Sequence, residues 1–271
     1  MRNRLLVVAA VLAVVAGACS DDGGSTTGPP ATTSDAERAL QAPAASITVD
    51  GDPADWTGVP ALDVTLEAIE GVDAASVDAA VQVAHDGDNI YVLFTVVDDY
   101  NWEEGDAHVS ASPNVMWAID SGAGPHMGAE EPDRDTSLGM VDLWHWEIEC
   151  GPGTEQGGAA SADSDDGNDP DCNFDDEWAA DPEDREDDDA ENSLLGVFTH
   201  TAQQNDAAGT YYFEMSRPLQ TGDSEDAQFA VGDTALLALA YFDPDTGGGE
   251  WDEEDHVVSS YQGWIRVTLA A

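Results

Sequence analysis

The sequence predicts an all-β fold, a β-sandwich or barrel, built by the residues from 46 to the end of the chain. Short runs rich in valine, isoleucine and aromatic residues recur, and clusters of glycine, aspartate, proline and asparagine separate them. Long helical periodicity is absent from the sequence. Many short strands between such turns are typical of packed sheets, and roughly 225 residues suit one large domain.

The best-defined predicted element is a hairpin. Residues 80–84 alternate, and the turn Asp-Gly-Asp-Asn at 86–89 leads into the apolar run 90–97. Two such runs around an Asp-Gly turn predict paired antiparallel strands. The other predicted strands are residues 47–49, 115–119, 141–148, 196–200, 210–216, 235–242 and 263–269.

The predicted strand at 47–49 ends in the turn Asp-Gly-Asp-Pro at 50–53. We expect Asp50 and Asp52 to shape this turn, because aspartate side chains accept hydrogen bonds from nearby backbone amides. Calcium binding by the same carboxylates is the alternative. We expect Trp56, just after the turn, to cap the sandwich rather than to bind sugar.

The predicted strand at 141–148 carries two tryptophans around one histidine, Trp144-His145-Trp146. Side chains alternate along a strand, so the two indoles share one face and His145 points to the other. Two large rings on one face need a core or a flat ligand to cover them. A core strand and the wall of a ligand pocket both remain open at this point.

Residues 151–192 interrupt the strand pattern with glycine, alanine, aspartate and glutamate. Clustered carboxylates are ligands that calcium prefers. Counted from Asp163, however, glycine falls at the wrong place for an EF-hand loop and Phe174 occupies the last ligand position. We therefore expect a solvated acidic insertion, with a specific calcium site as the less favoured alternative.

Residues 1–18 are typical of an export signal. Arg2 and Arg4 precede an apolar run at 5–15, and small residues lead to Cys19. This order resembles a lipoprotein signal, in which the cysteine is acylated and becomes the new N-terminus. The alternative is an ordinary cleaved signal. Residues 19–45 are rich in Ser, Thr, Gly, Pro and Asp and predict a flexible tether. We expect an exported, lipid-anchored protein at the outer face of the cell membrane or in the periplasm.

The two remaining cysteines, Cys150 and Cys172, are expected to pair, because an exported chain meets an oxidising compartment. A bridge between them would close the acidic insertion. Neither cysteine lies in a CxxCH motif, so the sequence gives no indication of covalent c-type haem attachment.

The chain has 57 acidic residues against seven arginines, and its formal net charge is −50. It contains no lysine. Such a charge excludes binding to nucleic acid or anionic lipid by electrostatic attraction. With 42% hydrophobic residues and eight tryptophans, the chain can nevertheless form a core. An acidic surface on a folded core indicates adaptation to high salt, which screens the self-repulsion.

Several stretches, in the same order along the chain, resemble known families. Residues 47–56 (ITVDGDPADW) and 86–92 (DGDNIYV) resemble family-9 carbohydrate-binding modules and their relatives. Later stretches look like the haem-binding domain of the ethylbenzene dehydrogenase gamma subunit and its relatives, the corresponding subunits of dimethyl-sulfoxide-reductase-type enzymes and cytochrome c-552-like proteins. These are residues 114–119 (NVMWAI), 141–146 (VDLWHW), 216–219 (SRPL), 221–223 (TGD) and 261–264 (YQGW). The resemblance covers about residues 46–270. It implies an immunoglobulin-like or DOMON-like β-sandwich, domain 46–271, with the acidic loop insertion.

The resemblance also implies one b-type haem whose iron is held by a methionine and a lysine. Met116 matches the methionine-bearing strand, where a thioether can ligate iron. The alternative is a core methionine. The lysine has no counterpart in this sequence. The candidate substitutes are His256, then His126, then His145, since neutral imidazole is a good iron ligand. For each, a plain structural role is the alternative.

Arg217 in the SRPL stretch either pairs with an acid or reaches a haem propionate. We expect the other three histidines, His85, His108 and His200, to lie at the surface. The sequence has no GxSxG, no HExxH and no phosphate-binding loop, so we expect no catalytic residues.

The resemblance implies electron transfer with a redox partner, either a molybdenum and iron–sulfur enzyme or a cytochrome. Two other functions remain open. The chain could be a carbohydrate-binding module that uses Trp144, Trp146, Trp102 or Trp117 as stacking platforms, or a haem-less structural or adhesion lipoprotein. Fold alone does not choose among these functions.

Overall fold

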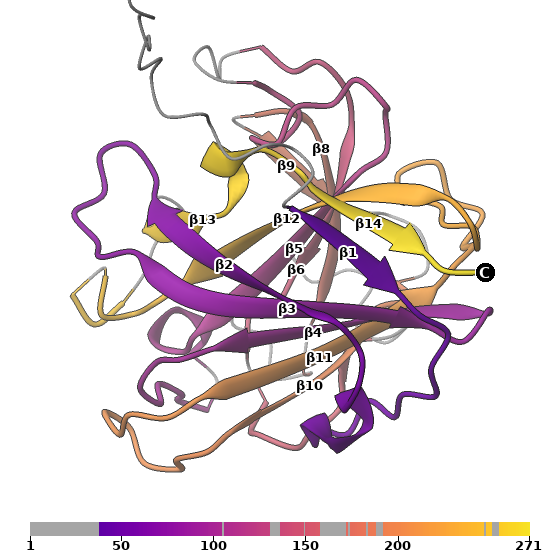
Figure 1. Ribbon diagram of the computed structural model, residues 1–271. Coiled ribbons are helices and arrows are strands. Elements are labelled where there is room, and N and C mark those ends of the chain that lie inside the picture. The colour runs from indigo at the N-terminus through magenta and orange to yellow at the C-terminus, as the bar shows by residue number, and fades with distance from the viewer. Residues whose placement is uncertain are drawn as a thin grey trace, which may run out of the picture. The chain divides into compact units, whose positions relative to one another are not determined.

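The computed structural model describes residues 38–271 except positions 105, 131–135, 149, 158–171, 173, 183, 188–191, 247 and 251–254. The described chain is an all-β sandwich (Figure 1). Its strands are β1 (Ala39–Ala42), β2 (Ala61–Ala68), β3 (Val77–His85), β4 (Asn89–Val96), β5 (Ser112–Ala118), β6 (Val141–His145), β7 (Gln156–Gly157), β8 (Asp175–Asp181), β9 (Asp184–Asp187), β10 (Leu195–His200), β11 (Tyr211–Pro218), β12 (Thr234–Phe242), β13 (His256–Val258) and β14 (Ile265–Leu269). The short 3-10 turns are η1 (Pro53–Trp56), η2 (Ala107–Val109) and η3 (Ser260–Gln262).

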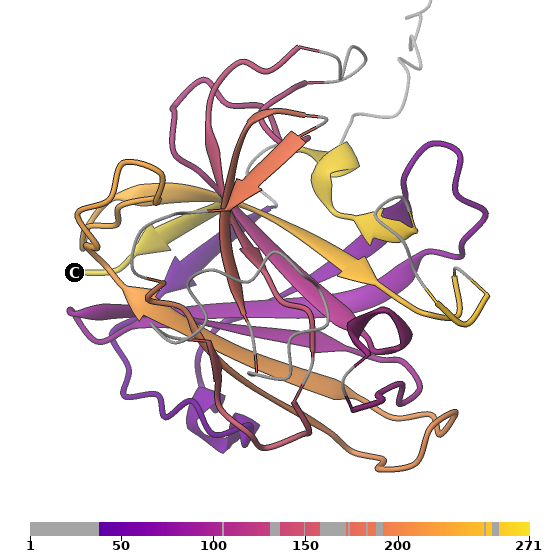
Figure 2. The same cartoon turned by 180° about the vertical axis from the view of Figure 1, so that it is seen from behind.

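The strands form one continuous, curled sheet in the order β7-β10-β11-β4-β3-β2-β13-β12-β5-β6-β8-β9. β14 pairs with β12 and with β1, and the β1–β14 pair is parallel while the other pairs are antiparallel. The two halves of the sheet meet where β2 pairs with the short strand β13. Figure 2 shows the same arrangement from behind. The curled sheet therefore provides two layers that can enclose a core between them.

The core lies between the two halves and is largely aromatic. Side chains alternate along each strand, so every second residue points inward. The larger inward side chains are Phe94, Tyr211 and Phe213 from one half, and Trp117, Trp144, Leu237, Leu239 and Tyr241 from the other. Burial of each such side chain contributes about 1.5–3 kcal/mol. This apolar interior stabilises a fold whose surface is strongly acidic.

Irregular segments cover parts of both outer faces of the sandwich. Ile47, Trp56 and Val59 pack on the outer face of β3 and β4 in a second apolar cluster. Ala123 and Met127 pack on the outer face of β5 and β6 in a third cluster. This coverage explains the apolar run at residues 90–94 of β4, because side chains on both faces of the strand are buried there.

The predicted hairpin is confirmed, because β3 and β4 pair antiparallel from Ala79–Val96 to His85–Ile90. Strands also occupy the predicted runs that became β5, β6, β10, β11, β12 and β14. The prediction of a strand at residues 47–49 is wrong. This segment has the right residue types but no strand partner, and it covers a sheet face instead.

The folded region begins before the predicted boundary at residue 46. β1, within the expected tether, pairs with β14 and buries Leu40 and Ala42. The signal segment 1–18, Cys19 and most of the tether lie outside the described residues. Among the residues that the structure does describe, no helix is long and apolar enough to cross a membrane.

The acidic region 151–192 is not simply a solvated insertion. It contains β7, β8 and β9, and β8 pairs with β6 along five residues. Asp176 and Glu177 on β8 are buried, at 7% exposure each. Their charges are compensated by arginines distant in sequence or on the next strand. Cys150 and Cys172 form a disulfide with their Cα atoms 5.0 Å apart, which ties the start of this region to the residues just before β8.

Candidate functional site

The two tryptophans that flank His145 belong to the core. Trp144 and Trp146 are completely buried, as is Trp117 on β5. Trp146 stacks on Phe174 with ring centroids 4.9 Å apart, and a Cβ atom added to Gly196 would lie only 2.8 Å from its ring. Three of the four tryptophans considered as sugar-stacking platforms are therefore inaccessible to any ligand.

Trp102 is the remaining candidate, and it is partly exposed. It lies between β4 and β5, at the end of the sandwich where β4, β10 and β12 end and β5 and β11 begin. Its six-membered ring lies against the backbone of Gly151, where an added Cβ would be 3.5 Å from the ring. Its backbone amide donates to Asn205 Oδ1 at 3.4 Å, and its indole Nε1 is buried without a hydrogen-bond partner.

Hydrogen bonds hold the loops at this end together. The Tyr100 amide donates to Ala207 O at 3.0 Å, and the Gly209 amide donates to Asp98 O at 2.8 Å. The Tyr241 hydroxyl, at the end of β12, donates to Asp98 Oδ2 at 2.7 Å. The loops β4–β5 and β10–β11 are therefore fixed to one another and to the core beneath them.

Carboxylates gather at this end beside the aromatic side chains. Burial raises the pKa of Asp98 despite the hydrogen bond from Tyr241. Burial, and then the negative charge of Asp98, raises the pKa of Asp243 to about 7. Asp99 and Asp245 add further negative charge to the surroundings of Asp243. This end of the sandwich, where Trp102 also lies, therefore carries several carboxylate hydrogen-bond acceptors.

The raised pKa of Asp243 predicts a pH-dependent stability. Because the folded-state pKa lies above the usual 3.8, protonation favours the fold, and this contribution is present below about pH 4 and lost as pH rises through 7. We expect Asp243→Asn to raise the free energy of unfolding by about 1 kcal/mol at pH 8, since solvent screens this partly exposed carboxylate, and to change it little at pH 4. Urea titrations at both pH values check this, with the exposed Asp233→Asn as control. An equal effect at both pH values would contradict it.

Met116, His145 and His256 lie on the outer face of the other half of the sheet. His145 points away from Trp144, as the strand alternation predicts, and its ring lies 5.9 Å from that of Phe242. Phe242 also stacks on His256, with ring centroids 4.6 Å apart. The structure thus places both His145 and His256 next to the phenyl ring of Phe242.

The residues do not fit a haem held between Met116 and His256. Met116 pairs across the sheet with Ala238 on β12, whereas His256 pairs with Phe242. Four residues along a strand span about 13 Å, and side chains stand roughly perpendicular to the sheet, so the two cannot reach one iron atom. Met116 is also 8% exposed and packs in the cluster that contains Ala123 and Met127. The Met116 thioether is therefore part of this apolar cluster.

His126 links the segment that follows β5 to the turn η3. Its Nδ1 lies 2.9 Å from Ser260 Oγ, and its ring lies 5.3 Å from that of Tyr261. The Tyr261 hydroxyl in turn accepts a hydrogen bond from the Glu70 amide at 2.9 Å. The contacts of His126 therefore connect the segment after β5 to η3, which is a structural role.

Arg217 pairs with acids, which was one of the two expected roles. It is 1% exposed and its guanidinium contacts Asp142, Asp176 and Asp226. It also donates to Ala227 O at 3.0 Å and lies 5.2 Å from the centroid of the Trp144 ring. Asp142 is fully buried, and burial raises its pKa to about 6 although Arg217 opposes this shift.

Two of the three histidines expected at the surface are buried. His85 is 3% exposed, and its Nε2 lies 2.9 Å from Ala270 O. His200 is 7% exposed, and its ring lies 4.3 Å from that of Tyr211. One ring nitrogen of each contacts a backbone carbonyl distant in the sequence, Ala270 O for His85 and Asp98 O for His200, and the local pattern does not reveal such partners. His108 is partly exposed.

The turn at 50–53 is organised by Glu214, a residue that no local sequence pattern identifies. Glu214 is completely buried on β11. Its Oε2 accepts from the amides of Asp50 at 2.9 Å and Gly51 at 2.6 Å, and its Oε1 accepts from Trp56 Nε1 at 2.6 Å. The Asp50 and Asp52 carboxylates accept from nearby amides, as expected for turn formation. Trp56 is 2% exposed and covers the outer face of the sandwich.

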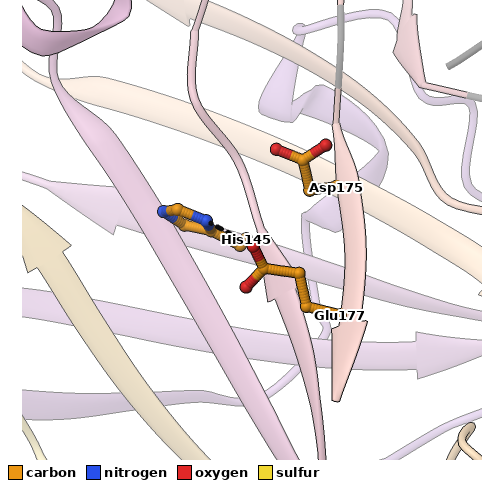
Figure 3. A group of neighbouring side chains, drawn as sticks. All are labelled: His145, Asp175 and Glu177. Carbon is orange, nitrogen blue, oxygen red and sulfur yellow. Dashed lines mark hydrogen bonds and ion pairs between the residues drawn. The ribbon is translucent and has the colours of Figure 1, made fainter. Parts of the chain in front are cut away.

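A cluster centred on His145 contains the donor atoms of a metal site. His145 Nδ1 lies 3.2 Å from Glu177 Oε1, and Asp175 completes a group whose donor atoms lie within 4.8 Å of one another (Figure 3). Arg185 Nη1 contacts both His145 Nδ1 and, at 3.0 Å, Glu177 Oε2. On the other side of the ring, His145 Nε2 lies 3.8 Å from Glu147 Oε1.

No protein-family model matches the chain, and no curated protein matches its sequence. Solved structures with some likeness include a protein from Bacteroides uniformis proposed to bind carbohydrate, at 9% identity and a TM-score of 0.45, covering 85% of this chain and 98% of that one. A family-9 carbohydrate-binding module from Caldicellulosiruptor kristjanssonii, in complex with cellotriose, has 11% identity and a TM-score of 0.43, covering 86% and 94%. The same kind of module in complex with glucose has 10% identity and a TM-score of 0.41, covering 86% and 96%. Likeness at these values carries no information on what this chain binds.

Proposed function

We propose that this chain is a non-catalytic carbohydrate-binding domain whose ligand stacks on Trp102. The observation that carries the proposal is the partial exposure of the Trp102 side chain, although its Nε1 atom is itself buried. Trp117, Trp144 and Trp146 are buried, while Trp102 is partly exposed within loops that are fixed to the core. A rigid aromatic side chain can pack against the apolar face of a sugar ring at a low cost in conformational entropy.

The polar side chains of the loops at this end of the sandwich suit the hydroxyl groups of a sugar. Asp98, Asp99, Asp243 and Asp245 supply carboxylate oxygens at this end, and Asn205 contacts the Trp102 backbone. Carboxylates and amides accept or donate hydrogen bonds with neighbouring hydroxyls. Because the chain carries a net charge of −50, it repels polysaccharides rich in carboxylate or sulfate. The expected ligands are therefore neutral glycans.

A glycan panel tests the proposal. We expect the purified protein, kept in molar NaCl, to bind one or more neutral glycans, and Trp102→Ala to weaken binding by at least tenfold, because stacking on one aromatic ring and its desolvation are lost. Trp102→Phe should retain part of the affinity. The matched control is Trp178→Ala, which removes another partly exposed tryptophan, on β8.

Two outcomes would contradict this function. One is the absence of binding to any neutral glycan by protein that is folded by circular dichroism. The other is binding that Trp102→Ala leaves unchanged. A Soret band with reduced α and β bands, obtained after haem is supplied, would support the electron-transfer alternative that the sequence resemblance implies.

A further inference from the structure

We infer that His145, Asp175 and Glu177 form a binding site for a divalent metal ion, and that the ion is zinc. The site lies on the outer face of β6 and β8 and shares no residue with the carbohydrate site proposed at Trp102. It therefore does not depend on the proposed carbohydrate function.

The first argument concerns the geometry of the donor atoms. His145 and Glu177 are buried, at 2% and 7% exposure, and strand pairing between β6 and β8 fixes their backbones. The distance of 3.2 Å between His145 Nδ1 and Glu177 Oε1 is close to the ~3.4 Å expected for two donors that each lie ~2.0–2.1 Å from one tetrahedral zinc ion. Asp175, two residues from Glu177 on β8, extends its carboxylate on the same side (Figure 3).

The second argument is a conflict at His145 Nδ1. This atom faces an acceptor, Glu177 Oε1, and also a donor, Arg185 Nη1. A protonated Nδ1 can donate to Glu177 but then opposes the guanidinium, whereas an unprotonated Nδ1 accepts from Arg185 but opposes the carboxylate. A metal ion in place of Arg185 removes the conflict, because the nitrogen lone pair and the carboxylate oxygen both point to the cation.

The third argument is the other side of the imidazole ring. Nε2 of the buried His145 has no hydrogen-bond partner, and neither does Oε2 of Glu147, which is 8% exposed. When Nδ1 binds a metal, the ring proton is on Nε2 and faces Glu147 Oε1 at 3.8 Å. A metal-bound histidine commonly donates its second N–H to a carboxylate in this way. Glu147 is thus a positioning residue for His145.

Arg185 occupies the cation position in the described structure. It is the residue through which the site can open, since its side chain is 28% exposed while that of Glu177 is 9% exposed. An imidazole with carboxylates favours zinc over calcium, because calcium takes six or more oxygen ligands. Binding therefore requires the guanidinium to move towards solvent and the metal to take its place.

Zinc titration by calorimetry tests the inference in molar NaCl with excess CaCl₂, which saturates the non-specific carboxylate sites. We expect one zinc ion per chain. His145→Ala and Glu177→Gln should each weaken binding by at least tenfold, while the control His108→Ala should leave it unchanged. Arg185→Ala should tighten binding about tenfold, because it removes the competing cation. A purely structural network would not gain affinity on losing Arg185.

The inference is overturned if calcium displaces the zinc, or if His145→Ala and Glu177→Gln bind zinc like the unaltered protein. It is also overturned if Arg185→Ala binds zinc no more tightly. Circular dichroism shows whether each variant is folded. The Arg185→Ala variant tests the site without removing a buried metal ligand. Zinc binding with no glycan binding would leave this site intact and refute only the proposed function.

Discussion

Arg217→Leu is expected to destabilise the fold by about 3–5 kcal/mol, because it leaves buried carboxylates without their cation. The guanidinium contacts Asp142, Asp176 and Asp226 between the two halves of the sandwich. Leucine fills part of the volume but donates no hydrogen bond. Urea unfolding in molar NaCl measures the change. Arg217→Lys should recover only part of the loss, because an ammonium group cannot replace the fixed fork of the guanidinium.

A double variant separates the charge effect from loss of packing. If unpaired charge dominates, Arg217→Leu with Asp142→Asn should be more stable than the sum of the two single effects predicts, since one of the buried charges is gone. The control is Arg266→Leu on β14, an exposed arginine that should change the free energy of unfolding by less than about 0.5 kcal/mol. A loss below about 1 kcal/mol for Arg217→Leu would contradict the role of this arginine.

Glu214→Leu is expected to destabilise the protein by about 3 kcal/mol and to release the segment that covers β3 and β4. The substitution leaves the amides of Asp50 and Gly51 and the indole of Trp56 without their acceptor, and each unsatisfied buried donor costs about 1–3 kcal/mol. Gly51 has a φ of +79°, and its carbonyl accepts a hydrogen bond from Thr199 Oγ1 at 2.5 Å, which restrains the turn in its present position.

Hydrogen exchange measures the release of that segment directly. The amides of Asp50 and Gly51 should lose protection in Glu214→Leu, and those of the β3–β4 hairpin should keep most of theirs. Glu67→Leu, at an exposed position of β2, is the matched control. Unchanged protection of Gly51 would show that Glu214 does not hold the turn.

The sequence predicted the parts of the fold that depend on local chemistry. The β3–β4 hairpin follows from its Asp-Gly turn and the flanking apolar runs, and the separation of His145 from its two tryptophans follows from strand alternation. The segment 47–49 has the same residue types but gains no strand partner, and composition alone does not reveal this. Local pattern specifies what a segment can form, while the strand partner decides whether it forms.

The parts that the sequence did not predict depend on contacts between distant residues. β8 has an acidic composition, and the burial of its Asp176 depends on the charge of Arg217, 41 residues further along the chain. Glu214 and Arg185 gain their importance in the same way, through partners 158 and 40 residues away. For the candidate site, the sequence analysis named four tryptophans as possible stacking platforms for a sugar. Three of them are fully buried in the structure, and Trp102 is partly exposed.

The most direct test of the carbohydrate proposal is the indole N–H spectrum of protein labelled with ¹⁵N-tryptophan, recorded during titration with the best neutral glycan from the panel. The indole N–H of Trp102, whose side chain is partly exposed, should shift in proportion to bound ligand, while those of the fully buried Trp117, Trp144 and Trp146 should stay in place. Trp102→Phe would assign the resonance. A shift confined to other tryptophans, or none at saturating glycan, would contradict a ligand site at Trp102.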